Sequence, residues 1–161
     1  MALVAASLTA SLTRVFSSPS EQGGVKAQEI ALAYQTYALT AMAGVLLPVF
    51  VGVEGQAMAS RLIPVMQRST NSPSDFANAL ADGVEAFWLL PPVPFSGGPA
   101  AGVVTGFPGK QVLVGALVGA LSSPSSDGAS VASRVATALD AGTRTVIVTF
   151  APPPGSTVTL V

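Results

Sequence analysis

Four carboxylates, Glu54, Asp82, Glu85 and Asp140, are the side chains of this 161-residue sequence that could pair for general acid–base work. Asp82 and Glu85 are three residues apart, a spacing that places both on one face of a helix. No aromatic subsite and no second set of polar residues accompanies them. We therefore interpret them as a solvated or interface-facing helix edge, and we rank a carboxylate-based enzyme last among the functions considered.

The lack of histidine and cysteine removes most other catalytic chemistry. With His 0 and Cys 0, the chain has no Ser-His-Asp or Cys-His arrangement, no thiolate site for a metal and no usual zinc ligand. The Gly102–Lys110 stretch superficially suggests a phosphate loop. Val104 stands where that motif requires glycine, and Gln111 where it requires serine or threonine. We expect no catalytic residue, no metal and no cofactor.

The densest aromatic cluster lies where a helical pattern gives way to prolines. It consists of Phe87, Trp88 and Phe95. Two interpretations stay open: a core anchor, which we favour, and an intersubunit hot spot, since tryptophan is enriched at such positions. The candidate interface anchors also include one face of a predicted C-terminal strand, which carries Val146, Val148 and Phe150.

Composition gives the strongest indication of function. The chain is 50% hydrophobic and 9% charged, with a net charge of −1 and a mean hydropathy of +0.61, whereas soluble domains carry roughly 25% charged residues. Because a lone monomer would have too little charge to cover itself, we expect sister subunits, other proteins or lipid to cover part of its surface. The 7 basic residues are scattered, which argues against nucleic-acid binding.

Helices are predicted for most of residues 1–90, which we treat as a helical region. The expected helices are, in order, a short amphipathic one through Leu8 and Leu12, one from Glu21 or Val25 to about Leu46, a shorter one over residues 55–67, and one that begins at Ser72. The last has the clearest start in the chain. Ser72 is suited to the N-cap, Pro73 to the first position, and Asp75 follows three residues after the cap.

The pattern changes at Pro91, where a second region, residues 91–125, begins. Its Pro91–Pro99 segment is predicted to be an extended connection, because its prolines exclude a regular helix or a central strand. Its apolar segment, Val112–Leu121, is ambiguous between helix and strand. The extended connection is stiff enough to reach a neighbouring subunit if it adopts polyproline II geometry.

The third region, residues 126–161, is predicted to hold a helix and a C-terminal hairpin. Ser126 or Asp127 would cap the helix, and Thr143–Phe150 and Thr157–Val161 would be the strands. Two strands alone are marginal in water, so we expect them to pair with a strand of this chain or of a neighbour. The predicted fold class is α+β, mainly α-helical with a small C-terminal β element and extended Pro/Gly-rich connections.

An apolar stretch supports the main alternative to a protein assembly. No charged residue occurs from Ile30 to Val53, and this length is borderline for the about 20 apolar residues that a spanning helix needs. Gln35 and Pro48 count against a span, and the flanking charges have no positive-inside asymmetry. We favour a helix buried in protein, and keep a small membrane-associated protein as the alternative.

The arrangement resembles the small alanine-rich virion proteins of tailed bacteriophages. The similar features are the opening MALVAASLTASL, the helix over Asp75–Asp82 with its aromatic end, the Gly102–Gly106 segment, and an end rich in Thr, Val and Pro. The resemblance implies a non-catalytic structural subunit of the virion, in the capsid, neck or tail. Its implied partners are further copies of itself in a homo-oligomer and other virion structural proteins.

Overall fold

The computed structural model describes residues 4–18, 22–97, 100–124, 127–151 and 157–161, and within them the chain forms six helices and five strands. The helices are α1 (Ala5–Ser17), α2 (Gly23–Ala38), α3 (Glu54–Met66), α4 (Pro73–Leu89), α5 (Lys110–Ser122) and α6 (Gly128–Thr143). The strands are β1 (Leu47–Pro48), β2 (Pro94–Gly97), β3 (Ala100–Gly106), β4 (Ile147–Ala151) and β5 (Thr157–Thr159). The predicted mainly helical α+β fold is confirmed. Glu21, Pro99, Ser126 and the turn at residues 152–155 lie outside the described residues.

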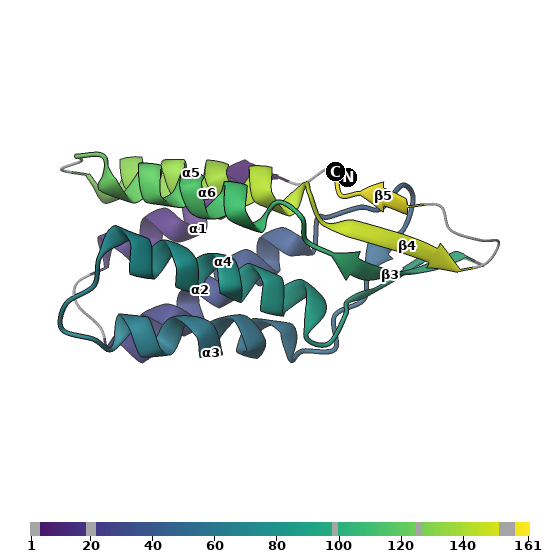
Figure 1. Ribbon diagram of the computed structural model, residues 1–161, viewed down its shortest axis with the longest axis horizontal. Helices are drawn as coiled ribbons and strands as arrows, with labels where there is room; N and C mark the ends of the chain where they lie inside the picture. The colour runs from purple at the N-terminus through teal and green to yellow at the C-terminus, as the bar shows by residue number, and fades with distance from the viewer. Residues whose placement is uncertain (1–3, 19–21, 98–99, 125–126, 152–156) are drawn as a thin grey trace.

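The helices form a bundle at one end of the molecule, and the strands form a sheet at the opposite end of the molecule (Figure 1). Each helix packs against the next one in the sequence, and α6 packs back against α1. One continuous hydrophobic core runs through the bundle and under the sheet, from Leu8 on α1 to Leu160 beside β5. Because burial of apolar surface is the main stabilising contribution to a fold, this shared core joins the bundle and the sheet into one unit.

Local capping chemistry fixes where two helices begin. At the start of α4, the Ser72 hydroxyl accepts a hydrogen bond from the Asp75 backbone N–H, and the Asp75 carboxylate accepts one from the Ser72 N–H, both at 3.1 Å. At the start of α6, the Asp127 carboxylate accepts from the Ala129 N–H at 3.1 Å. These contacts satisfy backbone donors that have no partner within the helix. Both predicted caps are confirmed.

The sheet is antiparallel, and its strand order follows the sequence from β1 to β5. The predicted C-terminal hairpin is confirmed as β4 and β5, and its third strand is β3 of the same chain. Beyond β5, Val161 exchanges two backbone hydrogen bonds with Met42, of 3.1 and 3.2 Å. The sheet takes strands from each of the three regions described above.

The predicted helix to Leu46 is wrong over its last third, because α2 ends at Ala38. Gly44 adopts a left-handed conformation with φ of 63°, and Ala43 and Leu46 close a tight turn through two backbone hydrogen bonds. Glycine tolerates this conformation at no steric cost. The chain then enters β1, where Leu47 pairs with Ser96. Sheet pairing therefore replaces the helix that the apolar pattern favoured.

The prediction that Pro91–Pro99 could not be a central strand is also wrong. Residues 94–97 form β2, which lies between β1 and β3. Pro94 is the first residue of the strand, a position that proline tolerates, and its carbonyl accepts a hydrogen bond of 2.8 Å from the Val49 N–H. Phe95 is buried. The described part of this segment is thus paired within its own subunit.

The structure also decides the type of one segment and moves the start of one strand. The apolar Val112–Leu121 segment, which was ambiguous in the sequence, lies within helix α5. The strand expected from Thr143 begins at Ile147 instead, because α6 continues to Thr143. The Thr143 hydroxyl donates to the Leu139 carbonyl at 2.7 Å, a bond to the preceding helical turn.

Candidate functional site

A buried chain of hydrogen bonds crosses the bundle and links three helices. The Trp88 indole on α4 donates to the Tyr34 hydroxyl on α2 at 2.8 Å, and the Tyr34 and Thr143 hydroxyls are 2.6 Å apart. Because Trp88 is only a donor and the Thr143 hydrogen goes to Leu139, the Tyr34 hydroxyl donates to Thr143. All hydrogen bonds of this series therefore run in one direction, from Trp88 to Leu139, and each of its polar hydrogens is donated to an acceptor. This network holds α2, α4 and α6 in register.

A second polar group ties α2 to the end of α6. The Tyr37 hydroxyl donates to the Asp140 carboxylate at 2.7 Å, and Arg144 forms an ion pair with the same carboxylate at 2.9 Å. Burial raises the pKa of both Tyr34 and Tyr37 above the ordinary tyrosine range. Neither phenol is therefore poised to ionise near neutral pH, and the arrangement suits a structural link better than proton transfer.

The structure places most of the predicted interface anchors inside the subunit. Phe87, Trp88 and Phe95 are at most 1% exposed, and Phe50 packs on Phe87 and Trp88 with ring centroids 5.2 and 6.0 Å apart. Val146 and Val148 are also buried, while Phe150 is partly buried against the core. Side chains this enclosed do not reach a second chain while the subunit stays folded. Their burial favours the core role of the aromatic cluster over the interface role.

The four carboxylates considered for acid–base chemistry bind structural partners at three separate places. Asp82 and Glu85 on α4 both bind Lys110 on α5, each at 2.7 Å. The buried Glu54 accepts hydrogen bonds of 2.9 Å from the backbone N–H groups of Val51 and Gly52, just before α3. Asp140 binds Tyr37 and Arg144, as described above. The Lys110 cluster joins two helices, Glu54 orders a turn, and the structure brings the four together at no common site.

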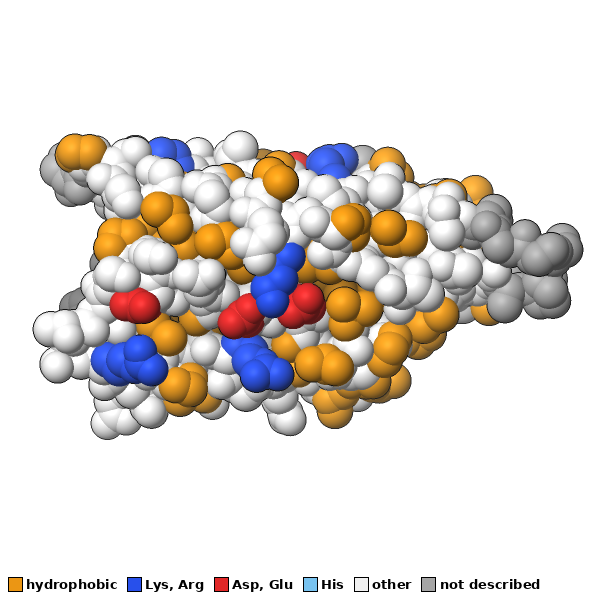
Figure 2. Space-filling view, viewed as in Figure 1, with side chains coloured by type: hydrophobic (Ala, Val, Ile, Leu, Met, Phe, Trp, Pro, Cys, Tyr) orange, Lys and Arg blue, Asp and Glu red, His pale blue; other side chains and the backbone are white. Residues whose placement is uncertain are grey.

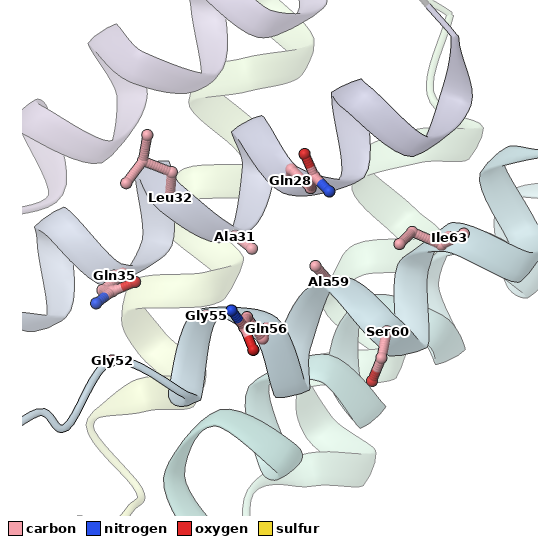
Figure 3. A pocket seen from close by; sticks show the side chains of 10 residues that line it. All are labelled: Gln28, Ala31, Leu32, Gln35, Gly52, Gly55, Gln56, Ala59, Ser60 and Ile63. Atoms are coloured by element: carbon pink, nitrogen blue, oxygen red, sulfur yellow. The ribbon is translucent and has the colours of Figure 1, made fainter.

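An open groove runs between α2 and α3 (Figure 3). Its volume is about 460 Å³. Ala31 and Ala59 face each other between the helices, so their small side chains leave space there. The amides of Gln28, Gln35 and Gln56 lie around them. These amides and the Ser60 hydroxyl can donate and accept hydrogen bonds, and the ten residues that line the groove include no acidic or basic side chain, so the groove is suited to binding.

Beside this groove lies an exposed apolar surface that the sequence analysis did not identify. We define the apolar ridge as the outward-facing side chains that precede α3: Val45, Leu47, Val49, Val51 and Val53. Of the residues between them, Leu46 is buried, Pro48 is partly covered and Phe50 packs on the aromatic cluster, while Gly52 is exposed. Gly52 lines the groove together with Leu32 of α2, so the ridge and the groove are continuous.

Hydrophobic side chains also gather over the end of the bundle where the chain enters α3 and leaves α4 (Figure 2). Leu90, Pro91 and Pro92 are exposed at this end. The hydrogen bond that the Val49 N–H of the ridge donates to the Pro94 carbonyl keeps the segment from Leu90 to Pro94 beside the ridge. The signal in the sequence was the uncharged run of apolar residues up to Val53, which we had assigned to a buried helix.

Comparison with protein-family models, curated proteins and solved structures found no match to this chain. Within the described parts of the chain, no helix has the length and apolar character needed to cross a bilayer. Among the same residues, no three acidic side chains lie close enough together to hold a metal ion.

Proposed function

We propose that this chain is a non-catalytic structural subunit that works within a multi-subunit protein assembly. The observation that carries the proposal is the apolar ridge together with the scarcity of charge. Val45 is 81% exposed and Val51 is 65% exposed, and only 9% of the residues are charged. A surface of this kind marks an interaction site on a soluble protein, because contact with another surface removes it from water.

The roles of the polar groups support the same proposal. Asp75 and Asp127 cap helices, Glu54 orders a turn, and Lys110 joins α4 to α5. Each of these groups stabilises the fold through a partner within the chain. The buried centres of protein interfaces are more apolar than ordinary surface and poor in charged residues, which agrees with a chain whose few charges serve its own fold.

The assembly that we propose is the particle of a tailed bacteriophage, in which the chain would be a capsid, neck or tail component. This part of the proposal rests on the resemblance of the alanine-rich helices and the Thr/Val/Pro-rich end to such virion proteins. Its partners would be further copies of itself and other structural proteins of the particle.

Quantitative mass spectrometry of purified particles tests the proposal. We expect the chain at a fixed ratio to the major capsid protein through successive density-gradient and high-salt purification steps. Recovery in the membrane fraction, with none in the particles, would contradict the virion role. A chain that stays monomeric at the highest soluble concentration and is absent from particles would contradict the structural role altogether.

A further inference from the structure

We propose that the apolar ridge is a self-association surface, covered by the same surface of a second copy of this chain. The inference rests on the proposed structural function and names the residues that would carry out assembly. The ridge comprises Val45, Leu47, Val49, Val51 and Val53, and through the groove that Gly52 lines it adjoins the exposed Leu32 of α2.

The first argument is that this segment is apolar on both of its faces. A strand with one solvated face alternates apolar and polar residues, whereas a strand covered on both faces is apolar throughout. The run from Val45 to Val53, in which Leu47 and Pro48 form β1, contains no polar side chain. Its inner face, with Leu46 and Phe50, packs on the subunit's own core. The outer face has the composition of a covered face, yet no element of the described chain covers it.

The second argument is that the backbone edge of this segment is already used. Leu46 exchanges hydrogen bonds of 3.0 and 3.1 Å with Ala43, and Pro48 has no N–H to offer. An edge with a proline and an internally bonded turn is poorly suited to pairing with another strand. A partner would therefore cover the side chains of the ridge by packing on their face.

The third argument concerns the nature of the partner. The exposed fractions of the ridge and Leu32 correspond to roughly 600 Å² of aliphatic surface, against the roughly 800 Å² that one partner buries in a stable interface. No charged residue occurs from Ile30 to Val53, so the surface has nothing to pair with a charged partner. An uncharged apolar patch is complementary to itself, as a two-fold symmetric interface requires.

Three lysine variants test the proposal by light scattering coupled to size-exclusion chromatography, over a range of protein concentrations. Val45→Lys and Val51→Lys each place a charge on the ridge. Val112→Lys is the matched control, because Val112 on α5 is 76% exposed and lies outside the ridge. Circular dichroism and melting temperature verify the fold of each variant. We expect the wild type and Val112→Lys to form dimers or larger species, and the two ridge variants to dissociate at concentrations at least tenfold higher.

The outcomes separate this inference from the proposed function. An oligomeric wild type whose association is unchanged in both ridge variants overturns the inference and leaves the structural function standing. A wild type that is monomeric throughout overturns the inference, and it overturns the structural function as well if the chain is also absent from purified particles. A monomeric wild type that sediments with phosphatidylcholine vesicles, and loses this property in Val51→Lys, would identify lipid as the occupant and would also overturn the inference.

Because the sequence contains no cysteine, cross-linking gives an independent readout. A single Val51→Cys variant should form a disulfide-linked dimer under mild oxidation, and Val112→Cys should not. Equal cross-linking of the two variants would indicate random collision and would contradict a specific interface at the ridge.

Discussion

The indole nitrogen of Trp88 donates its hydrogen to the hydroxyl of Tyr34 across 2.8 Å, and both side chains are fully buried. The two residues lie on different helices, 54 positions apart in the sequence. Tyr34 also packs edge-on against Phe87, the neighbour of Trp88, with ring centroids 5.1 Å apart. The pair thus combines apolar packing with a satisfied polar contact, and it fixes the C-terminal end of α4 against that of α2, where the bundle meets the sheet.

Replacing Trp88 with alanine should lower the free energy of unfolding by about 3–5 kcal/mol, because the substitution leaves a large cavity and removes the donor to Tyr34. In a chain of this length we expect the melting temperature to fall by roughly 6–20 °C. Differential scanning calorimetry measures the change. Val112→Ala, at an exposed position, is the control and should change the free energy by less than about 0.5 kcal/mol. Equal stability of the two variants would contradict the anchor role of Trp88.

Tyr34→Phe should lower the free energy of unfolding by about 1–3 kcal/mol, because it leaves the buried indole N–H of Trp88 without an acceptor. The loss should be smaller in a Trp88→Phe background, where no indole remains to be satisfied. Urea denaturation of the two single variants and the double variant gives this coupling energy. If the losses in unfolding free energy of the two single variants add up to that of the double variant, the hydrogen bond between Trp88 and Tyr34 does not stabilise the fold.

The two tyrosines of the chain should stay protonated for as long as the protein is folded. Burial raises the pKa of Tyr34 and of Tyr37 above the ordinary value of 10.0, so folding favours the protonated phenols. Their contribution to stability is fully present below pH 10.0 and is lost as the pH rises above it. Absorbance titration should show phenolate near pH 10.0 in urea, but in native buffer only when circular dichroism reports unfolding. Phenolate in a protein with native circular dichroism would refute this.

Two adjacent glycines at the start of α2 should respond in opposite directions to the same substitution. A Cβ on Gly23 would overlap the carbonyl oxygen of Met66 at the end of α3, so Gly23→Ala should destabilise the fold by about 1–3 kcal/mol. A Cβ on Gly24 would meet nothing closer than the Gln67 amide at 3.5 Å. Gly24→Ala should therefore be neutral or stabilise by up to about 1 kcal/mol. Melting temperatures in the reverse order would show that α2 and α3 are not in close contact here.

Neutralising the partners of Lys110, in Asp82→Asn/Glu85→Gln, should change stability at pH 7 by no more than about 1 kcal/mol for each partly exposed pair. The hydrogen bonds that the Lys110 ammonium donates, first to Asp82 and second to Glu85, raise the pKa of Lys110 above its ordinary value of 10.5. Their contribution is present below pH 10.5 and is lost as the pH rises through the raised value. The difference in free energy of unfolding between the variant and the wild type should therefore become smaller as the pH rises above 10.5. Assembly should be unaffected, and its loss with an intact fold would show a direct role for these carboxylates.

The start of α4 could be predicted from the sequence because its cause is local. Ser72, Pro73 and Asp75 supply the cap, the fixed backbone angle and the reciprocal hydrogen bond within four residues. The Asp127 cap and the β4–β5 hairpin are of the same kind. In each case the residues that determine the structure are neighbours in the chain, so the pattern alone carries the information.

The fate of residues 39–53 could not be predicted in this way, because its cause is distant. An uninterrupted apolar run is compatible with a buried helix or with a strand covered on both faces. Pairing of Leu47 with Ser96 decides for the strand, and packing of Phe50 on Phe87 and Trp88 decides which face turns outward. The sequence pattern therefore did not reveal the exposed apolar ridge. The aromatic cluster could be recognised from the sequence, but the choice between a core role and an interface role needed the structure.

Closure of the bundle by α1 and α6 has a consequence for the order in which the protein folds. The α3–α4 and α5–α6 pairs join helices that are close in sequence, so they can form early at a small cost in loop-closure entropy. Packing of Ala5–Ser17 against Gly128–Thr143 closes a loop that spans most of the chain, and contacts of such long range form late. Substitutions at the α1–α6 contact should therefore accelerate unfolding far more than they slow folding. The lifetime of the folded subunit would then depend on its first helix.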